Sequence, residues 1–330
     1  MRYGLPYKGS KNAIAEWIVN ALPPAEVFVD LFCGGGAVTH YAMLTRKYKR
    51  FIMNDIDGRL PILFRDCAYG KYTTKTHPEW ISRAEFNARK HDDAYIALVW
   101  SFGNNGVDYL YGADIEPFKH AYHILVFQGD AEPIRKFGYD IEVSDNPDVI
   151  ARYYFYKRQI KEQTLDARDA KRMEIFQSFL NALAAENISR LGKYPYDLDC
   201  TVRQIEIERL QSLQSLQSLQ SLQSLQSDYS AIEIPHGALI YCDPPYAGTN
   251  CGKYDGFDHK RFYEWALKQE NIFISEYAMP EPFIEVADIQ KSVLSTANGD
   301  SGKVTEKIFT NPKTYEMYGG IPCDRQLSLF

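Results

Sequence analysis

The segment Val27–Gly36, VFVDLFCGGG, predicts the fold. Its first three residues are an apolar run typical of a buried strand, and its three glycines form a turn where that strand ends. Ala37 to Leu44 then has a helical pattern, and Phe51 to Met53 is a second apolar run. A strand, a glycine turn, a helix and another strand make a βαβ unit, so the sequence predicts a parallel sheet.

Similar patterns extend this unit toward both ends of the chain. Lys11 to Leu22 has apolar residues at helical spacing and ends at two prolines. Near the other end, Ala238 to Cys242 and Ile272 to Ser275 are strand-like, and Lys260 to Gln269 between them is helical. The simplest architecture is an α/β, doubly wound domain made of residues 1–64 and 228–330. Residues 65–227 are then an inserted second domain.

Composition limits the class of protein. The chain has 330 residues, a formal net charge of −6, 45% hydrophobic and 24% charged residues, which is ordinary for a globular protein. No run approaches the roughly 20 apolar residues of a membrane span, and Met1 to Gly9 lacks the apolar core of a signal peptide. The six cysteines are scattered without a C-x-x-C pair, which argues against a zinc site or a disulfide framework and favours a reducing cytoplasm.

The middle of the chain differs from its ends. Trp100 to Gly112 is rich in Tyr, Asn and Gly, which indicates loops with exposed aromatic residues. Two helix-like stretches follow, near Pro147 to Gln163 and Arg168 to Ile188, so we expect the insert to be mainly helical.

The insert ends in six perfect copies of Leu-Gln-Ser, from Leu210 to Ser227. A period of three matches neither the helix nor the strand, because its leucines drift about 60° per copy around a helix. The pattern leaves a turn stack, a frayed helix and a flexible linker open. We favour a spacer of variable copy number, since these side chains offer no chemistry.

Asp243-Pro244-Pro245-Tyr246 follows directly after a predicted strand. Open α/β sheets bind ligands at the carboxyl ends of their strands. The prolines fix the backbone, so the Asp243 side chain and the Pro244 carbonyl form a rigid pair of acceptors for the two hydrogens of an amino group. The Tyr246 ring offers a flat face on which a base can stack, worth about 1–3 kcal/mol. A simple strand-ending turn is the alternative.

The glycine turn indicates a second ligand. Glycines let the backbone approach a nucleotide-like molecule closely, but G-x-G-x-x-G spacing and a P-loop lysine are both missing. The pattern therefore fits a nucleoside cofactor without a pyrophosphate. Asp55 ends the next strand about 20 residues on, where a carboxylate can accept hydrogen bonds from ribose hydroxyls. Capping of the following helix is the alternative role for Asp55.

Four motifs, in this order, resemble the Dam-like class of DNA adenine-N6 methyltransferases. They are YKGSK at Tyr7–Lys11, the glycine motif at Asp30–Gly36, Asn54–Asp55, and DPPY at Asp243–Tyr246. The resemblance covers residues 5–60 and 228–310, including Gly256–His259 and Ile274–Tyr277. The family's usual second glycine in the first motif is Ser10 here, which still allows a tight turn.

The resemblance implies a Rossmann-like methyltransferase sheet in the catalytic domain and a target-recognition role for the insert. It also implies direct methyl transfer from S-adenosylmethionine to a flipped adenine. The catalytic residues would be Asp243, Pro244 and Tyr246. The cofactor-binding residues would be Tyr7, Lys11, Asp30, Phe32, Gly34, Asp55 and Asp243. No covalent intermediate and no metal are expected.

The insert also contains candidate DNA contacts. Ser101 to Gly112 resembles the DNA-contacting loop region of the family, and Asn side chains can pair bidentately with adenine. Arg152 to Arg172 holds seven basic and three acidic residues, a local charge of +4 in an acidic protein. The candidates for DNA binding are Asn104, Asn105, Tyr109, Tyr111, Arg158 and Lys161. The net charge argues against a polybasic binder, but not against a DNA enzyme with a local basic surface.

Two alternative functions remain. Enzymes that methylate cytosine N4, RNA adenine or protein glutamine mostly carry Ser or Asn in place of Asp243, so Asp243 favours DNA adenine. A non-catalytic DNA-binding relative is the second alternative, against which the intact motifs argue. The expected partner is double-stranded DNA, and a cognate restriction endonuclease is a partner that the resemblance allows. We expect a monomer in solution, in the cytoplasm of a bacterium or encoded by a phage.

Overall fold

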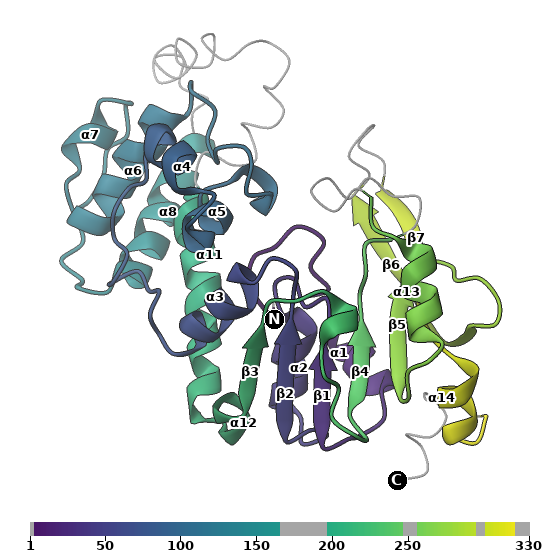
Figure 1. The fold of residues 1–330 in the computed structure, drawn as a ribbon. Coiled ribbons are helices and arrows are strands. Elements are labelled where there is room, and N and C mark those ends of the chain that lie inside the picture. Colours follow the sequence, from purple (N-terminus) through teal and green to yellow (C-terminus); the bar gives the residue numbers. More distant parts are fainter. Residues whose placement is uncertain (1–2, 166–196, 247–255, 295–300, 321–330) are drawn as a thin grey trace. The chain divides into compact units, whose positions relative to one another are not determined.

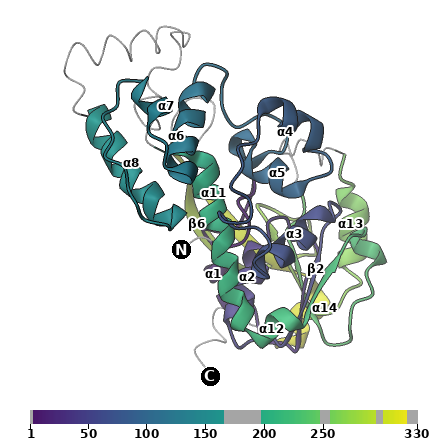
Figure 2. The same cartoon turned by 90° about the vertical axis from the view of Figure 1, so that its left-hand side faces the viewer.

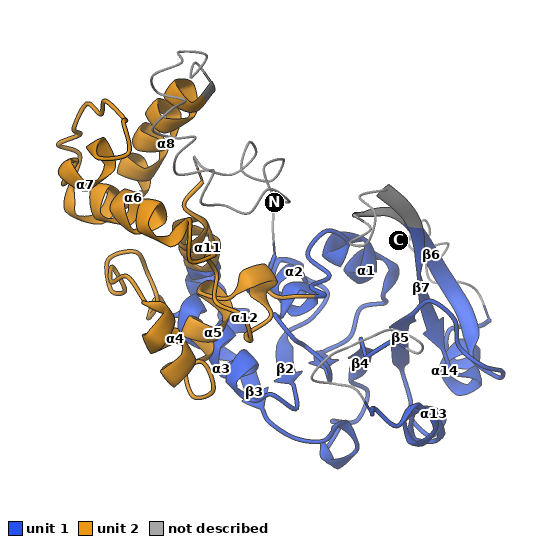
Figure 3. Cartoon of the chain, turned by 90° about the horizontal axis from the view of Figure 1, so that it is seen from above, with its two compact units in different colours: residues 1–5, 9–69, 210–330 blue, residues 6–8, 70–209 orange. Residues whose placement is uncertain are grey.

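The computed structural model describes residues 3–165, 197–246, 256–294 and 301–320 (Figure 1). Contacts divide the chain into two compact units, coloured separately in Figure 3. Unit 1 comprises residues 1–5, 9–69 and 210–330, and unit 2 comprises residues 6–8 and 70–209. The insert thus gives way to unit 1 at residue 210, at the start of the Leu-Gln-Ser repeat, and not after residue 227.

Unit 1 contains a seven-stranded sheet. Its strands are β1 (Val27–Asp30), β2 (Arg50–Asn54), β3 (Leu222–Leu225), β4 (Leu239–Cys242), β5 (Ile272–Glu276), β6 (Ile284–Leu294) and β7 (Ser301–Thr310). They lie in the order β3-β2-β1-β4-β5-β7-β6. The first five strands are parallel, and β7 is antiparallel to both of its neighbours, β5 and β6. This mostly parallel sheet confirms the predicted Rossmann-like fold. The strand order reverses between β1 and β4, which is where open α/β sheets bind ligands.

Helices cover both faces of this sheet. Those of unit 1 are α1 (Ala15–Ala21), α2 (Ala37–Leu44), α3 (Arg59–Ala68), α12 (Gln217–Gln220), α13 (His259–Ala266) and α14 (Pro312–Met317), with 3-10 turns η3 (Arg209–Ser215) and η4 (Tyr229–Ala231). In Figure 3, α1 and α2 lie on one face and α13 on the other. Val27 and Val29 of β1 pack with Phe262 of α13. Phe28, between these two valines, points to the opposite face and is equally buried, which explains why this part of β1 is apolar on both faces.

The strand register brings the carboxyl ends of the central strands level with one another. Asp30, the last residue of β1, is paired with Met53 of β2 and Tyr241 of β4. The residues that directly follow these neighbouring strands are therefore delivered to one edge of the sheet. Asp55 follows β2 and Asp243 follows β4.

The Leu-Gln-Ser repeat is a structural part of unit 1. Successive copies form η3, then α12, then the edge strand β3, which pairs with β2. The sequence pattern did not predict a strand, because a period of three does not alternate side chains between two faces. Serines of consecutive copies bond to backbone carbonyls elsewhere in unit 1: Ser221 Oγ donates to Lys49 O at 2.8 Å, and Ser224 Oγ donates to Pro61 O at 3.1 Å.

The end of the repeat is held by Asn54, the last residue of β2. Its Nδ2 donates to Ser227 O at 3.0 Å, and its Oδ1 accepts from Ser227 N at 3.0 Å. The same Nδ2 donates to Leu31 O at 3.0 Å. Asn54 therefore ties the end of the repeat to the loop that follows β1.

The described part of unit 2 is helical. It contains α4 (Arg83–Arg89), α5 (Ala94–Val99), η1 (Phe102–Asn104), α6 (Glu116–Gln128), α7 (Glu132–Arg135), α8 (Val149–Leu165) and α11 (Asp199–Glu208). Helices α6, α7 and α8 lie side by side (Figures 1 and 2). Helix α8 agrees with the stretch expected from Pro147 to Gln163, whereas Arg168 to Ile188 lies outside the described residues.

Candidate active site

Four carboxylates lie at the carboxyl ends of four neighbouring parallel strands. Asp30 and Glu276 are the last residues of β1 and β5, and Asp55 and Asp243 directly follow β2 and β4. Asp30, Asp55 and Glu276 are each at most 6% exposed. Buried carboxylates are costly unless they are paired, and a cluster of them is typical of a functional site.

The glycine turn is organised by Asp55. Asp55 Oδ2 accepts the backbone N–H of Gly34 at 2.9 Å, and Oδ1 accepts that of Asp57 at 2.9 Å. Gly34 and Gly36 have φ values of +48° and +70°. The left-handed conformation of Gly36 favours glycine, and a Cβ there would lie 2.6 Å from Met53 Cε and 2.8 Å from Phe64 Cδ2, so both side chains would have to shift. The motif and Asp55, which were predicted to act together, are therefore joined directly.

Asp30 is buried behind this turn. Its Oδ2 accepts a hydrogen bond from Thr39 Oγ1 at 2.7 Å. Burial raises the pKa of Asp30 to about 7, the Thr39 hydrogen bond opposes the rise, and the charges of Asp243 and Asp55 add to it. Within the described residues, its Oδ1 is buried and has no hydrogen-bond partner. An acceptor of this kind fits a cationic group such as the ammonium of an amino-acid moiety.

The DPPY motif meets the amino-terminal lysine. Lys11 Nζ lies 2.8 Å from Asp243 Oδ1, and it lies over the Tyr246 ring, 4.6 Å from the centroid. Lys11 is nearly buried, with 9% of its side chain exposed. An ammonium group thus lies against the same carboxylate and the same ring that were predicted to hold the amino group and the plane of a base.

The charges of this site depend on each other. Burial lowers the pKa of Lys11, but the negative charges of Asp243 and Glu306 outweigh burial, so the pKa is raised. Burial raises the pKa of Asp243 above its usual value, and Lys11 counteracts much of that rise. Lys11 therefore stays protonated and keeps Asp243 available as an acceptor.

Three further residues hold the DPPY motif in place. Tyr246 Oη donates to Glu306 Oε2 at 2.6 Å, and its ring meets the Tyr277 ring edge-on, with centroids 4.6 Å apart. His259 Nε2 lies 2.8 Å from the Pro245 carbonyl oxygen. His259 and Tyr277 belong to the two segments that resemble the family after the motif. Glu306 gave no signal in the sequence.

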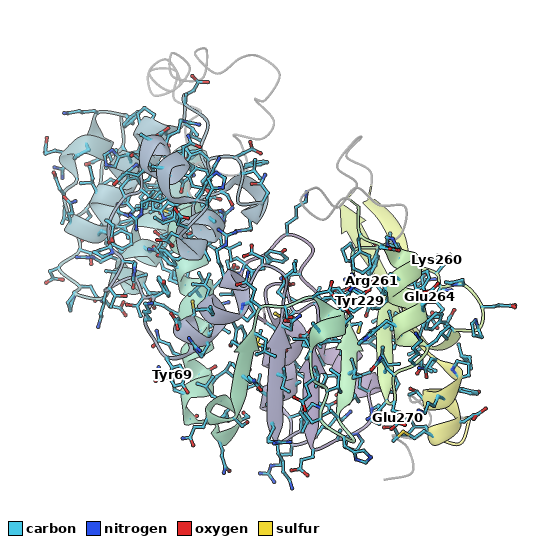
Figure 4. The ribbon with its side chains drawn as sticks, viewed as in Figure 1. Tyr69, Tyr229, Lys260, Arg261, Glu264 and Glu270 are labelled. Carbon is cyan, nitrogen blue, oxygen red and sulfur yellow. The ribbon has the colours of Figure 1, made fainter. Side chains whose placement is uncertain are left out.

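Phe32 and Tyr7 are placed differently. The Phe32 ring packs among aromatic residues on the α13 side of the sheet, 5.4 Å from Tyr229 and 5.6 Å from Phe262. Arg261 covers Tyr229, with Cζ 5.5 Å from the ring centroid, and Figure 4 labels the two side by side. The Phe32 side chain is thus structural, which leaves its backbone for ligand contact. Tyr7 is assigned to unit 2, and its role stays a prediction.

The four candidate DNA contacts of the 100–112 region separate into two pairs. Tyr109 and Tyr111 are buried in unit 2. Tyr109 Oη donates to Ile81 O at 2.7 Å, and the Tyr111 ring stacks on Trp80 with centroids 5.4 Å apart. Their rings pack the core, so we no longer expect them to contact DNA. The sequence suggested otherwise because a tyrosine-rich segment looks the same whether its rings face inward or outward.

Asn104 and Asn105 shape the loop that joins Ser101 to Tyr109. Asn104 has a positive φ of 56° and donates to Leu98 O at 2.9 Å. Asn105 Oδ1 accepts from Val107 N at 2.8 Å. The loop presents two large apolar side chains to solvent, Phe102 and Val107, each 60% exposed. Phe102 belongs to the segment that was expected to expose aromatic residues, whereas Val107 gave no signal in the sequence.

The basic segment is described only in part. Arg158 and Lys161 are exposed on α8, three residues apart and so on one face of the helix. Arg168, Lys171 and Arg172 lie outside the described residues.

Two kinds of feature are absent from the described residues. None of their helices is long and apolar enough to cross a membrane. Over the same residues, no group of three or more His, Cys, Asp or Glu side chains is arranged to hold a metal ion.

A comparison with known protein families matches the amino-terminal part of the chain. The model of the D12 class N6 adenine-specific DNA methyltransferase family matches residues 7–96. The matched region contains the lysine motif, the glycine turn and Asp55. None of the curated proteins matches the chain.

Proposed function

We propose that the chain methylates N6 of an adenine held by Asp243 and Tyr246. The proposal starts from the match of residues 7–96 to the D12 class of N6 adenine-specific DNA methyltransferases. S-adenosylmethionine is the proposed methyl donor. The observation that supports this assignment is the contact of Lys11 with both Asp243 and Tyr246, because a nitrogen donor lies against that carboxylate and that ring at once.

The cofactor would lie across the ends of β1 and β2. When bound, S-adenosylmethionine supplies a methyl group activated by a sulfonium charge. Asp30 Oδ1 would accept from its ammonium group, and Asp55 would accept from its ribose hydroxyls. The backbone from Phe32 to Gly34 is proposed to contact the cofactor between these two carboxylates. Tyr7 and Lys11 are proposed to close the site from the amino-terminal side.

Asp243 and the Pro244 carbonyl would orient the target amino group. An adenine inside a duplex is out of reach, so the base is proposed to flip out and stack on Tyr246. Two acceptors fix both hydrogens of the amino group and so aim its lone pair outward, toward the methyl donor. Catalysis then comes mainly from positioning, together with stabilisation of the positive charge that moves onto the nitrogen.

Unit 2 is proposed to bind the DNA target. Phe102 and Val107 offer an apolar loop tip, Asn104 and Asn105 hold that loop in shape, and Arg158 and Lys161 offer charge for phosphates. Activity on DNA suits a cytoplasmic protein of a bacterium or of a phage that infects one. We also propose that the protein is a monomer in solution and that a cognate restriction endonuclease is its partner.

Replacement of Asp243 by Ala tests the role of the site. We expect methylation of DNA adenine to fall by at least about 100-fold, because the amino group loses its anionic acceptor. DNA binding, measured by fluorescence anisotropy, should stay within about twofold of wild type. Glu285→Ala is the matched control, since Glu285 is a more exposed carboxylate of the same sheet. Retained methylation in Asp243→Ala contradicts the proposal.

A further inference from the structure

Glu306 is a buried carboxylate that the proposed chemistry does not use. It lies in β7, where the antiparallel ladder pairs it with Ile289 of β6, and it is 2% exposed. Its neighbour Lys307, by contrast, forms an ion pair with Glu285. A buried carboxylate in the middle of a strand is costly, so it needs a partner of matching strength.

One such partner is Tyr246 of the DPPY motif. The 2.6 Å distance from Tyr246 Oη to Glu306 Oε2 is short, as expected for a hydroxyl that donates to an ionised carboxylate. This hydrogen bond fixes the far end of the ring. The edge-on contact with Tyr277, at an interplanar angle of 84°, restrains rotation about the ring's long axis. Together the two contacts define the plane of the surface on which a base would stack.

Glu306 also acts on the charges beside that ring. Its negative charge raises the pKa of Lys11, as that of Asp243 does. With Asp243 and Glu306 both ionised and Lys11 protonated, these three groups carry a net charge of −1. A methyl transfer moves positive charge from sulfur to nitrogen, and a negative surrounding stabilises it at its destination.

We propose that Glu306 is a positioning residue for the methyl transfer, which acts through the hydroxyl of Tyr246 to fix the stacking face for the target adenine. This inference rests on the proposed function. Glu306 itself touches no reacting atom; it acts on the orientation of Tyr246 and on the charge of the pocket.

A double-mutant cycle tests the inference. Glu306→Gln removes the charge and weakens the hydrogen bond, Tyr246→Phe removes its donor, and a third variant combines both. Glu285→Gln is the control for loss of a carboxylate from the same sheet. We measure kcat, KM for S-adenosylmethionine, and the fluorescence of DNA carrying 2-aminopurine at the target position, which reports how a flipped base stacks.

Each single variant should lower kcat about tenfold or more, the loss expected when a hydrogen bond to a charged group is weakened. KM for S-adenosylmethionine should change less than about twofold. The double variant should be no slower than the worse single variant, because both changes break the same interaction. The 2-aminopurine signal should change in all three variants but not in Glu285→Gln.

Two results would overturn the inference. One is a fall of kcat in the double variant equal to the product of the falls in the two single variants. The other is a Glu306→Gln variant with the kcat and the 2-aminopurine fluorescence of wild type. If Glu306→Gln fails to fold, Tyr246→Phe removes the same hydrogen bond from its other end, and wild-type kcat there is equally decisive. Failure of the proposed function is a separate outcome, since the wild-type protein would then form no N6-methyladenine.

Discussion

The ammonium of Lys11 lies 2.8 Å from the Asp243 carboxylate in a largely buried ion pair. Lys11 comes from the first motif of the chain and Asp243 from the last, 232 positions later, so the fold joins the two ends of the catalytic unit at one contact. This ion pair controls the charge of the residue that would hold the target amino group.

Loss of Lys11 should shift the pH dependence of methylation. Lys11 lowers the pKa of Asp243 against the effect of burial, so Lys11→Met should let that pKa rise. Asp243 is then protonated over a wider range, and the acidic limb of the kcat profile moves to higher pH. Activity near pH 7 falls and recovers in part as the pH is raised. Measurements of kcat from pH 6 to 9 check this, with Lys8→Met as control. If the acidic limb of the Lys11→Met profile lies at the same pH as in wild type, the prediction is wrong.

Asp30 should make unliganded protein less stable as the pH rises. Its pKa is raised from the usual 3.8 to about 7, so the folded state binds this proton more tightly than the unfolded state. The protonated Asp30 carboxyl contributes its full share to the free energy of unfolding below about pH 4, and this share is lost as the pH rises through 7. A shift of this size corresponds to about 4 kcal/mol. Asp30→Asn should lack this dependence. Denaturant unfolding at pH 5, 6, 7 and 8 gives the free energy of unfolding of both proteins. If this free energy changes with pH by the same amount in both, Asp30 is not the cause.

The same carboxyl should couple cofactor binding to pH. A bound ammonium stabilises ionised Asp30, so wild-type affinity for S-adenosylmethionine should increase from pH 6 to pH 8 with release of a proton. Calorimetry in two buffers of different ionisation enthalpy detects that proton. In Asp30→Asn, binding should be weaker and proton release should be absent. Equal release in both proteins would assign the proton to another group.

Phe102 should contribute to DNA binding without contributing to the fold. Its side chain is 60% exposed, so Phe102→Ala should leave the thermal midpoint of unfolding almost unchanged. Loss of one stacking or apolar contact predicts about a tenfold weaker Kd for DNA. Val143→Ala is the control, because Val143 is an apolar residue of the same unit that is 49% exposed and lies outside α8. Equal DNA affinity in the Phe102 and Val143 variants would show that this loop does not contact DNA.

Asn54 should be important for the stability of unit 1. Its buried side chain makes three hydrogen bonds, to Leu31 O and to the backbone of Ser227. Asn54→Ala should cost about 3 kcal/mol, at roughly 1 kcal/mol for each bond. Asn87→Ala, on an exposed face of α4, should cost little. Chemical denaturation gives both values, and a cost below about 1 kcal/mol would mean that the repeat is not held at this point.

The elements that were predicted correctly have strong local signals. The expected helix from Ala37 to Leu44 coincides with α2, and the strand expected at Phe51–Met53 lies within β2. Because a strand end determines where the next side chain emerges, the positions of Asp55 and Asp243 at the sheet edge followed from the same patterns. Local pattern was sufficient for these elements because their apolar residues match the period of a helix or form a short buried run.

The features that were missed depend on tertiary contacts. The β3 strand exists because β2 offers an unpaired edge and Asn54 binds Ser227, neither of which is visible in Leu-Gln-Ser copies. Glu306 is flanked by Thr305 and Lys307, so its sequence position gives no sign of burial, and its contact with Tyr246 joins two segments 60 residues apart. Helix α1 begins at Ala15 and not at Lys11, which leaves the lysine free to reach Asp243.

Analysis of the methylated product tests the central claim most directly. Purified protein is incubated with S-adenosylmethionine and duplex DNA, and the DNA is then digested to nucleosides and examined by mass spectrometry. The account predicts N6-methyldeoxyadenosine, formed by the wild-type protein and absent with Asp243→Ala. Methylcytosine as the only modified nucleoside would contradict it, as would equal amounts of N6-methyldeoxyadenosine from both proteins.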